Sequence, residues 1–408
     1  MTDAHDVEGL LRAAAPRALG ALVRRRGDFA EAEDAMQEAL LAAVIEWQAA
    51  GPPDDPIAWL VRVADRRLID SWRTGSARRR REQAVAEDPD PGPASSRDES
   101  LELLLLCCHP SLTLSSQIAL TLRAVGGLTT EEIAHAFLVP SATIGQRISR
   151  AKARLRGARF ELPAPSELPE RIAAVAAVIY LIFTEGHTAS SGALLHRVDL
   201  ADEAIRLGRM LLALTRAQPA LRDEEGEVAG LLALMLLTHA RHAARSTAQG
   251  ELVPLAEQDR RLWDRSLIDE GVALVTSALT GSPLGPYQLQ AAIAAVHDEA
   301  ATADDTDWRE VLGLYDLLVA LAPSPVTRLN RVVALAMVDG PAAGLLALDT
   351  AGADRTLVDH HRTHAVRAHL LEQIGDPAGA RAEYELAAKL THSIPERRHL
   401  LGRASHLA

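Results

Sequence analysis

The stretch 128–159 restricts the fold of this chain more than any other, because its cap and turn residues require two short helices around a tight turn. Thr129 and Glu132 form a capping box, in which each side chain satisfies a free backbone N–H of the first helical turn. Pro140 cannot continue a helix and also restricts the residue before it, so the chain turns there. Ser141 is then the expected N-cap of the second helix.

The second helix combines an apolar stripe with a basic remainder. Ile144, Ile148 and Leu155 recur at helical spacing and predict a buried stripe. The other positions carry polar and basic side chains and no acid: Thr143, Gln146, Arg147, Arg150, Lys152, Arg154, Arg156 and Arg159. A capped helix, a turn and a helix with a basic face is the arrangement that inserts side chains into the major groove of DNA. An ordinary helical hairpin with a solvated basic face is the alternative.

The composition predicts an all-α protein of more than one domain. A chain of 408 residues is too long for one typical core. Aromatic residues make up only 3%, and runs of Ala and Leu with little β-branched alternation favour helices throughout. The net charge of −12 is unevenly distributed along the chain. Residues 1–160 hold 21 Lys and Arg against 22 Asp and Glu, whereas residues 161–408 hold 22 Lys and Arg against 33 Asp and Glu. The acidity therefore belongs to the C-terminal part, and an N-terminal part with clustered arginines can still bind nucleic acid.

Cysteines and apolar runs exclude several classes of protein. The two cysteines, Cys107 and Cys108, are adjacent, which suits neither a disulfide between them nor, together with His109, a standard zinc pattern. The chain shows no signal peptide, and no uncharged run is long enough to span a bilayer. We therefore expect a cytoplasmic protein without a metal or cofactor.

Residues 7–48 predict two helices, and the second has an acidic outer side. Phe29, Ala32, Met36, Leu40, Ala43 and Trp47 supply its apolar face. Glu31, Glu33, Asp34, Gln37, Glu38 and Glu46 occupy the other side. Such a side repels DNA, so it is either solvated or docks on a basic protein surface.

After a proline-rich turn at 51–56, a helix beginning near Pro56 interleaves arginines with Trp59 and Trp72. The arginines are Arg62, Arg66, Arg67, Arg73 and the run 78–81. Cations beside aromatic rings suit a phosphate backbone and unpaired bases, although each tryptophan could equally belong to the core. Residues 82–100, rich in Pro, Ser, Asp and Glu, predict a flexible linker. Residues 101–125 supply further helix, broken at Pro110.

These motifs, in this order, resemble an extracytoplasmic-function (ECF) sigma factor over roughly residues 7–159. The resembling stretches are AEDAMQEALLAAVIEW, PIAWLVRVADRRLIDSWR and LTTEEIAHAFLVPSATIGQRISRAKARLR. The resemblance implies sigma region 2 at 1–81, the linker at 82–100, region 4 at 101–160 and a C-terminal extension at 161–408. It further implies that Asp34, Gln37 and Glu38 bind core RNA polymerase. The implied −10 residues are Trp59, Arg62, Arg66, Arg67, Asp70 and Arg73, although many members carry Asn where Arg66 stands. The implied −35 residues are Ser141, Thr143, Gln146, Arg147, Arg150, Lys152 and Arg154.

The C-terminal extension predicts stacked helices. Residues 332–349 and 368–390 align with Pro341 on Pro377, an offset of 36 residues that is close to the tetratricopeptide (TPR) repeat. Ala378, Ala382, Tyr384 and Ala387 stand at small and aromatic positions that such repeats use. The motifs CCHPSL, GGLTTEEIA and FLVPSAT resemble an ECF subgroup whose long C-terminal extension is TPR-like. An acidic array of this kind could bind a basic protein partner or a small ligand.

Several polar clusters of the extension admit two interpretations. They are Thr184 to His187, Gln258 to Arg260 with Trp263 and Asp264, Tyr287 with Gln288 and Gln290, and His297 to Glu299. We favour hydrogen-bonded joints between helices over a ligand pocket, because buried polar groups need partners in any case. His239 with His242, and His360 with His361 and His364, have spacings that could bind metal but lack the usual acid or thiol.

The sequence therefore predicts a sigma factor that directs core RNA polymerase to promoter DNA. The runner-up is a helix-turn-helix regulator with a TPR-like sensor that does not act as a sigma subunit. A third class, an enzyme using the His, Asp and Glu clusters at 185–300, lacks a nucleophile elbow, P-loop or zincin motif, so we expect no enzyme.

Overall fold

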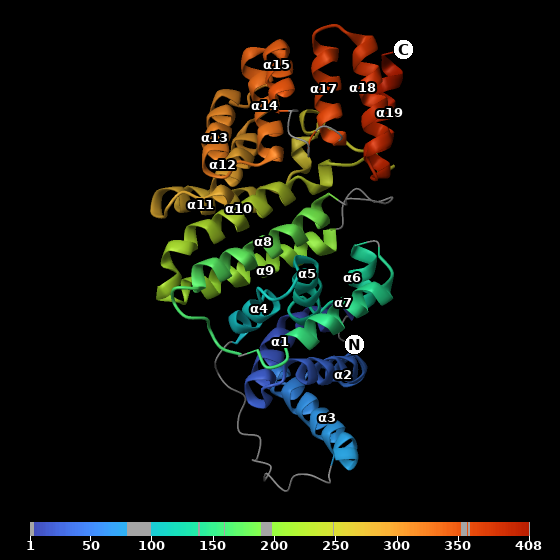
Figure 1. Ribbon diagram of the computed structural model, residues 1–408, viewed down its shortest axis with the longest axis vertical. Helices are drawn as coiled ribbons and strands as arrows, with labels where there is room; N and C mark the ends of the chain where they lie inside the picture. Colours follow the sequence, from blue (N-terminus) through green and yellow to red (C-terminus); the bar gives the residue numbers. More distant parts are fainter. Residues whose placement is uncertain are drawn as a thin grey trace. The chain divides into compact units, whose positions relative to one another are not determined.

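The computed structural model describes residues 4–79, 99–137, 139–158, 160–188, 198–247, 249–351, 357 and 360–407 (Figure 1). Within these residues the regular structure is helical, and an isolated antiparallel β-bridge joins Ser246 and Leu252. The predicted all-α class is confirmed. The chain divides into two compact units, Met1–Val178 and Ile179–Ala408, and the division falls inside helix α8 (Leu168–His187).

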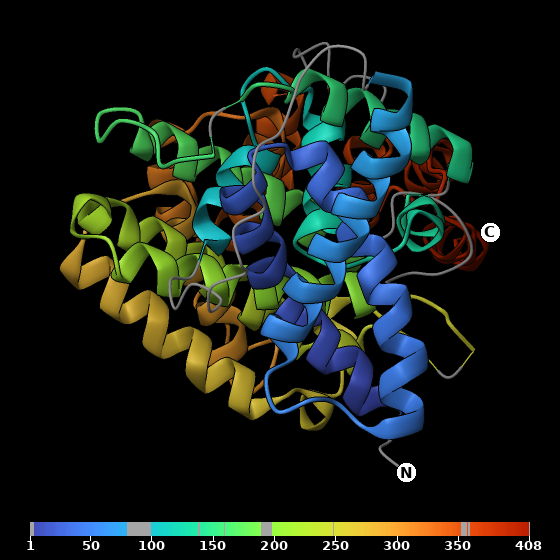
Figure 2. The ribbon, with the colours of Figure 1, turned by 90° about the horizontal axis from the view of Figure 1, so that it is seen from below.

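The first unit begins with a bundle of three helices: α1 (Ala4–Arg26), α2 (Phe29–Ala50) and α3 (Pro56–Arg79). Gly27 ends α1 with a φ of 80°, a conformation that suits glycine. Asp28 then caps α2 by accepting from the backbone N–H groups of Ala30 and Glu31. The three helices pack side by side (Figure 2), around buried side chains such as Leu22, Met36 and Leu60.

Four shorter helices complete this unit: α4 (Ser100–Cys107), α5 (Leu114–Ala124), α6 (Thr130–Ala136) and α7 (Ser141–Arg154). The capping box is confirmed, since the Thr129 N–H donates to the Glu132 carboxylate at 2.6 Å and the Glu132 N–H donates to Thr129 Oγ1 at 3.1 Å. The predicted N-cap was wrong by one residue. Pro140 is the N-cap of α7 and Ser141 is its first helical residue, because the extended backbone of Pro140 (φ −58°, ψ 141°) already ends the turn.

The expected linker falls mostly on residues 80–98, which lie outside the described residues, as do Arg159 and the two arginines at 80 and 81. Its predicted end was too late. Glu99 and Ser100 are buried at the start of α4, where Arg24 of α1 lies 3.0 Å from the Glu99 carboxylate. A charge contact with α1 therefore fixes residues whose composition predicted only a solvated chain.

The second unit starts with the C-terminal part of α8 and continues through α9 (Val198–Arg216), α10 (Glu225–Ala240), α11 (Arg265–Gly281) and α12 (Pro286–Glu299). The 3₁₀ turn η1 (Pro219–Glu224) lies between α9 and α10, and η2 (His242–Ala244), η3 (Leu255–Glu257) and η4 (Arg260–Leu262) lie between α10 and α11. Helix α10 is apolar almost all round and buried between α9, α11 and α12. Gly230 of α10 permits this packing, since a Cβ there would lie 2.7 Å from the Gln288 backbone nitrogen.

The remaining helices stack as antiparallel neighbours: α13 (Trp308–Leu321), α14 (Pro325–Asp339), α15 (Pro341–Ala351), α17 (His361–Gln373), α18 (Pro377–Leu390) and α19 (Ile394–His406). The aligned prolines each begin the second helix of a hairpin, after Gly340 or Gly375 with positive φ. The TPR-like arrangement of helix pairs is therefore confirmed. In α18, Tyr384, Ala387 and Ala380 are buried, whereas Ala378 and Ala382 are exposed.

Candidate nucleic-acid and protein interface

The outer side of α2 carries a stripe that mixes acid and apolar side chains. Asp34 and Glu38 are exposed and Gln37 is half-buried, as the sequence predicted for a protein-binding side. The same stripe continues through Leu41 and Ile45, which are 67% and 74% exposed. The spacing of four, three and four residues from Asp34 to Ile45 keeps these side chains on one helix face. Exposed apolar residues beside acids are typical of a docking surface rather than of a solvated face.

One acid of α2 is not exposed at all. The Glu33 side chain is 1% exposed and forms ion pairs with Arg123 of α5 at 3.2 Å and with the Lys152 ammonium of α7. Lys152 also lies 2.6 Å from the Asp34 carboxylate. A buried carboxylate without a cation would be very costly, so these contacts fasten α2 to the helix-turn-helix in this structure.

The basic side chains of α3 lie on its outer surface. Arg62, Arg66 and Arg67 are exposed, and so is Asp70. Arg67 approaches the Glu38 carboxylate at 3.9 Å, a long and exposed pair that leaves its guanidinium available to other partners.

The sequence left two roles open for Trp59, a core residue or a ring that stacks on bases, and its position in the structure is compatible with both. It is half-buried and packs edge-to-face on the buried Trp47 of α2, with ring centroids 5.3 Å apart. Its ring therefore anchors α3 to α2 and still has an accessible part. Arg73 lies in α3, and Trp72 does too, but their side chains lie outside the described part of the structure.

The side chains expected to contact the −35 element divide into two groups on α7. Ser141, Gln146 and Arg150 are exposed, and Thr143 and Arg147 are half-buried. Lys152 and Arg154 are engaged within the chain: Lys152 is 12% exposed and paired as described, and Arg154 donates to the Ser111 carbonyl oxygen at 2.8 Å. The buried stripe of Ile144, Ile148 and Leu155 holds α7 against α5 and α6.

The two cysteines lie buried in and directly after α4, where burial raises the pKa of both thiols, that of Cys108 to about 12. Cys108 Sγ lies 3.6 Å from Thr121 Oγ1. Protonated, inaccessible thiols neither ligate metal nor react readily. Among the described residues no group of three or more His, Cys, Asp or Glu side chains could hold a metal ion.

Most polar clusters of the second unit serve helix ends. Asp264 caps α11 by accepting from Ser266 and Leu267, and the Gln288 side-chain amide donates to the Pro283 carbonyl oxygen at 2.7 Å. Arg260 donates to the carbonyl oxygens of His297 and Ala300, both at 2.7 Å. These contacts match the interpretation as hydrogen-bonded joints.

Two other clusters meet in one cavity of about 450 Å³. Thr184 and His187, at the end of α8, line it together with His360 and His361, at the start of α17. His361 Nε2 lies 3.5 Å from the Glu396 carboxylate, which also accepts from Thr391. The sequence placed these groups in separate clusters, because nothing local relates positions so far apart in the chain.

Family models match three parts of the chain. Sigma-70 region 2 matches residues 10–79, and sigma-70 region 4 matches residues 102–155. A family of unknown function (DUF6596) matches residues 171–279. Together with the helix order described above, these matches define a protein of the sigma-70 class with a C-terminal helical extension, as the resemblance predicted.

The chain belongs to the same family as the uncharacterized protein R00370 of Rhizobium meliloti (strain 1021). The two are 42% identical over 422 aligned residues, which cover all of this chain and 97% of the relative. The probable ECF RNA polymerase sigma factor SigI of Mycobacterium tuberculosis is 29% identical over 149 residues, covering 34% of this chain and half of the relative.

Among solved structures, the crystal structure of yeast Tom70 aligns with this chain at a TM-score of 0.33 and 12% sequence identity. The alignment covers 99% of this chain and 84% of the Tom70 chain. In the part of the chain that the structure describes, no helix is long and apolar enough to cross a membrane.

Proposed function

We propose that the protein is an ECF-type sigma factor that directs core RNA polymerase to specific promoters and initiates transcription there. The observation that carries the proposal is the combination of sigma regions 2 and 4 with two chemically different surfaces. One is the acid and apolar stripe on α2, which suits a protein partner, and the other comprises the arginine-lined faces of α3 and α7, which suit DNA.

The proposed roles follow from these surfaces. Asp34, Gln37 and Glu38 bind the core enzyme, together with the exposed Leu41 and Ile45. Trp59, Arg62, Arg66, Arg67, Asp70 and Arg73 recognise the −10 element, where rings and guanidinium groups can stack on separated bases. Ser141, Thr143, Gln146, Arg147, Arg150, Lys152 and Arg154 contact the −35 element, at base edges near the start of α7 and at phosphates near its end.

The contact of Lys152 with Glu33 and Asp34 then has a functional consequence. The same ammonium cannot hold two carboxylates of α2 and a DNA phosphate at once, and Asp34 cannot hold it while docked on the polymerase. The α2–α7 contact therefore belongs to a resting form that opens when the core enzyme and the promoter are engaged.

The C-terminal extension has a regulatory or interaction role under this proposal. Its helix pairs form a scaffold for a partner or a ligand, and its polar clusters chiefly hold helix ends together, which gives an enzyme little support.

Reversing the charge of the α2 stripe tests the polymerase-binding part of the proposal. We expect Asp34→Lys/Glu38→Lys to abolish co-elution with purified core RNA polymerase on gel filtration, because two favourable charge contacts become repulsive. Glu46→Lys, at an exposed position about 100° around α2 from the stripe, is the matched control and should co-elute like the wild type. Unchanged co-elution of the double variant, or no co-elution of the wild type, would favour the alternative of a regulator that is not a sigma subunit.

A further inference from the structure

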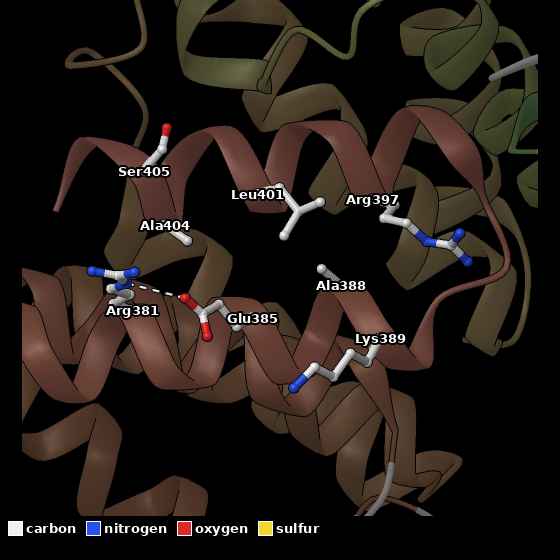
Figure 3. A pocket seen from close by; sticks show the side chains of 8 residues that line it. All are labelled: Arg381, Glu385, Ala388, Lys389, Arg397, Leu401, Ala404 and Ser405. Carbon is white, nitrogen blue, oxygen red and sulfur yellow. Dashed lines mark hydrogen bonds and ion pairs between the residues drawn. The ribbon is translucent and has the colours of Figure 1, made fainter. Parts of the chain in front are cut away.

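A groove of about 560 Å³ runs between α18 and α19 in the second unit (Figure 3). Three cations border it: Arg381 and Lys389 on α18, and Arg397 on α19. The only acid among its lining residues is Glu385, which accepts from Arg381 at 3.0 Å four residues away on the same helix.

Two of these cations are available to a partner. Neither Lys389 nor Arg397 forms an ion pair with any carboxylate of the described residues. Arg397 is held in place by one hydrogen bond, which its guanidinium donates to the Thr391 carbonyl oxygen at 2.8 Å. An oriented guanidinium loses less conformational entropy when it binds a carboxylate.

The floor of the groove is apolar. Ala388 of α18 and Ala404 of α19 are buried and small, and they leave depth between the helices. Leu401, which is 47% exposed, points into the groove from α19 (Figure 3). Covering such a side chain with an apolar group from a partner removes apolar surface from water, which favours binding.

The charge of the groove contrasts with the rest of the extension. Residues 161–360 hold 15 Lys and Arg against 28 Asp and Glu, whereas residues 361–408 hold 7 against 5. Duplex DNA would extend beyond the groove over an acidic protein, but a short peptide stays within about 10 Å of the three cations, the range of unscreened charge. An apolar floor also suits a peptide better than a phosphate backbone.

We propose that the groove binds a short acidic segment of a partner protein, with an apolar side chain inserted over Ala388 and Ala404 and carboxylates paired with Lys389 and Arg397. The partner is thus the opposite of the basic one that the overall acidity of the extension predicted, and the groove does not depend on the proposed role in transcription.

Fluorescence anisotropy with the full-length protein tests the groove. The probe is a short fluorescein-labelled peptide of repeated Glu-Leu-Asp units, and its neutral counterpart carries Gln and Asn in place of the acids. We expect the wild type to bind the acidic probe, and Lys389→Glu/Arg397→Glu to weaken binding at least about tenfold, since both charge contacts become repulsive. Arg309→Glu, at an exposed position of α13 outside the groove, should bind the probe like the wild type.

Leu401→Ala separates the apolar contact from the charges. It should weaken binding about threefold to tenfold without changing the salt dependence, and circular dichroism of every variant checks that the helices persist. Equal binding of the probe by wild type and Lys389→Glu/Arg397→Glu overturns the proposal, and so does equal binding of the acidic and neutral peptides. If Lys389→Glu/Arg397→Glu instead keeps its binding of the acidic peptide and loses only its binding of a random-sequence DNA duplex, the groove is a nucleic-acid surface.

Discussion

At the scale of single residues, His297 and Asp298 at the end of α12 show how burial sets charge in the second unit. Burial, helped by the nearby Arg241 and Arg260, lowers the pKa of His297 to about 4. Burial raises the pKa of Asp298 to about 6, although the same two arginines oppose the shift. His297 is therefore neutral in the folded protein at pH values where an unfolded chain already carries the charge.

This pKa difference predicts a pH dependence of stability. A histidine with a lowered pKa stabilises the fold fully above its unfolded pKa near 6.5, and that contribution is lost as the pH falls through 6.5 toward 4. Between pH 7 and pH 5 the wild type should lose up to about 2 kcal/mol of unfolding free energy through this residue, a loss that His297→Gln avoids. Urea unfolding of the full chain, followed by tryptophan fluorescence at both pH values, measures the difference. The exposed His392→Gln is the control, and parallel pH profiles of wild type and His297→Gln would contradict the account.

The capping box of α6 is the residue-scale feature that the sequence predicted best, because it depends only on residues three apart. Thr129→Ala removes the acceptor of the Glu132 N–H and should cost about 1 kcal/mol of stability. The thermal unfolding midpoint of the variant measures this cost. Thr130→Ala, at the next position, is the control and should have little effect. Similar unfolding midpoints of the wild type, Thr129→Ala and Thr130→Ala would show that the capping box does not stabilise α6.

Other residue-scale features could not be predicted from local sequence. The N-cap of α7 shifted to Pro140 because backbone conformation alone ends that turn, without a side-chain hydrogen bond. Leu41 and Ile45 were not singled out, since a helix with a complete apolar face gives no sign that further apolar residues lie outside it. The signal that could have found them is their place on the same helix face as Asp34 and Glu38.

At the scale of elements, the contact between α2 and α7 is the feature that sequence analysis missed. The individual helices were predictable from periodicity and caps, but Asp34 and Lys152 are 118 residues apart in the chain. Each was assigned to a different external partner, and in the structure they bind each other. Complementary charge on two separate helices permits such a contact without specifying it.

Energy transfer between dyes on α2 and α7 tests whether this contact opens. Donor and acceptor are attached at Glu46→Cys and Gln146→Cys, since the buried Cys107 and Cys108 should label slowly. We expect transfer to fall when core RNA polymerase is added, and also to fall without polymerase in Lys152→Glu, which places a third carboxylate beside Glu33 and Asp34.

Arg150→Glu is the matched control for this measurement, because it reverses an exposed charge on the same helix where the structure records no ion pair. Its transfer should equal that of the wild type. High transfer in Lys152→Glu, or no change on addition of polymerase, would mean that the α2–α7 contact is permanent.

At the scale of the whole molecule, the order of the motifs and the different charges of the two halves of the chain predicted the class of protein and its helical extension. Sigma regions 2 and 4 could be recognised because their motifs are contiguous in sequence. The surfaces of the extension could not, since the cavity beside His360 and the groove beside Arg397 each form only when separate helices pack together. Net charge did not indicate the three cations of the groove, because it averages over surfaces that a partner meets one at a time.

Transcription from genomic DNA with purified core RNA polymerase shows whether the protein acts as a sigma factor. The template is fragmented DNA of the organism that encodes the chain, and the 5′ ends of the transcripts are sequenced. We predict a set of start sites with shared −10 and −35 sequences that requires the full-length protein, persists with Glu46→Lys and disappears with Asp34→Lys/Glu38→Lys. Transcripts no different from those of the core enzyme alone would contradict the account.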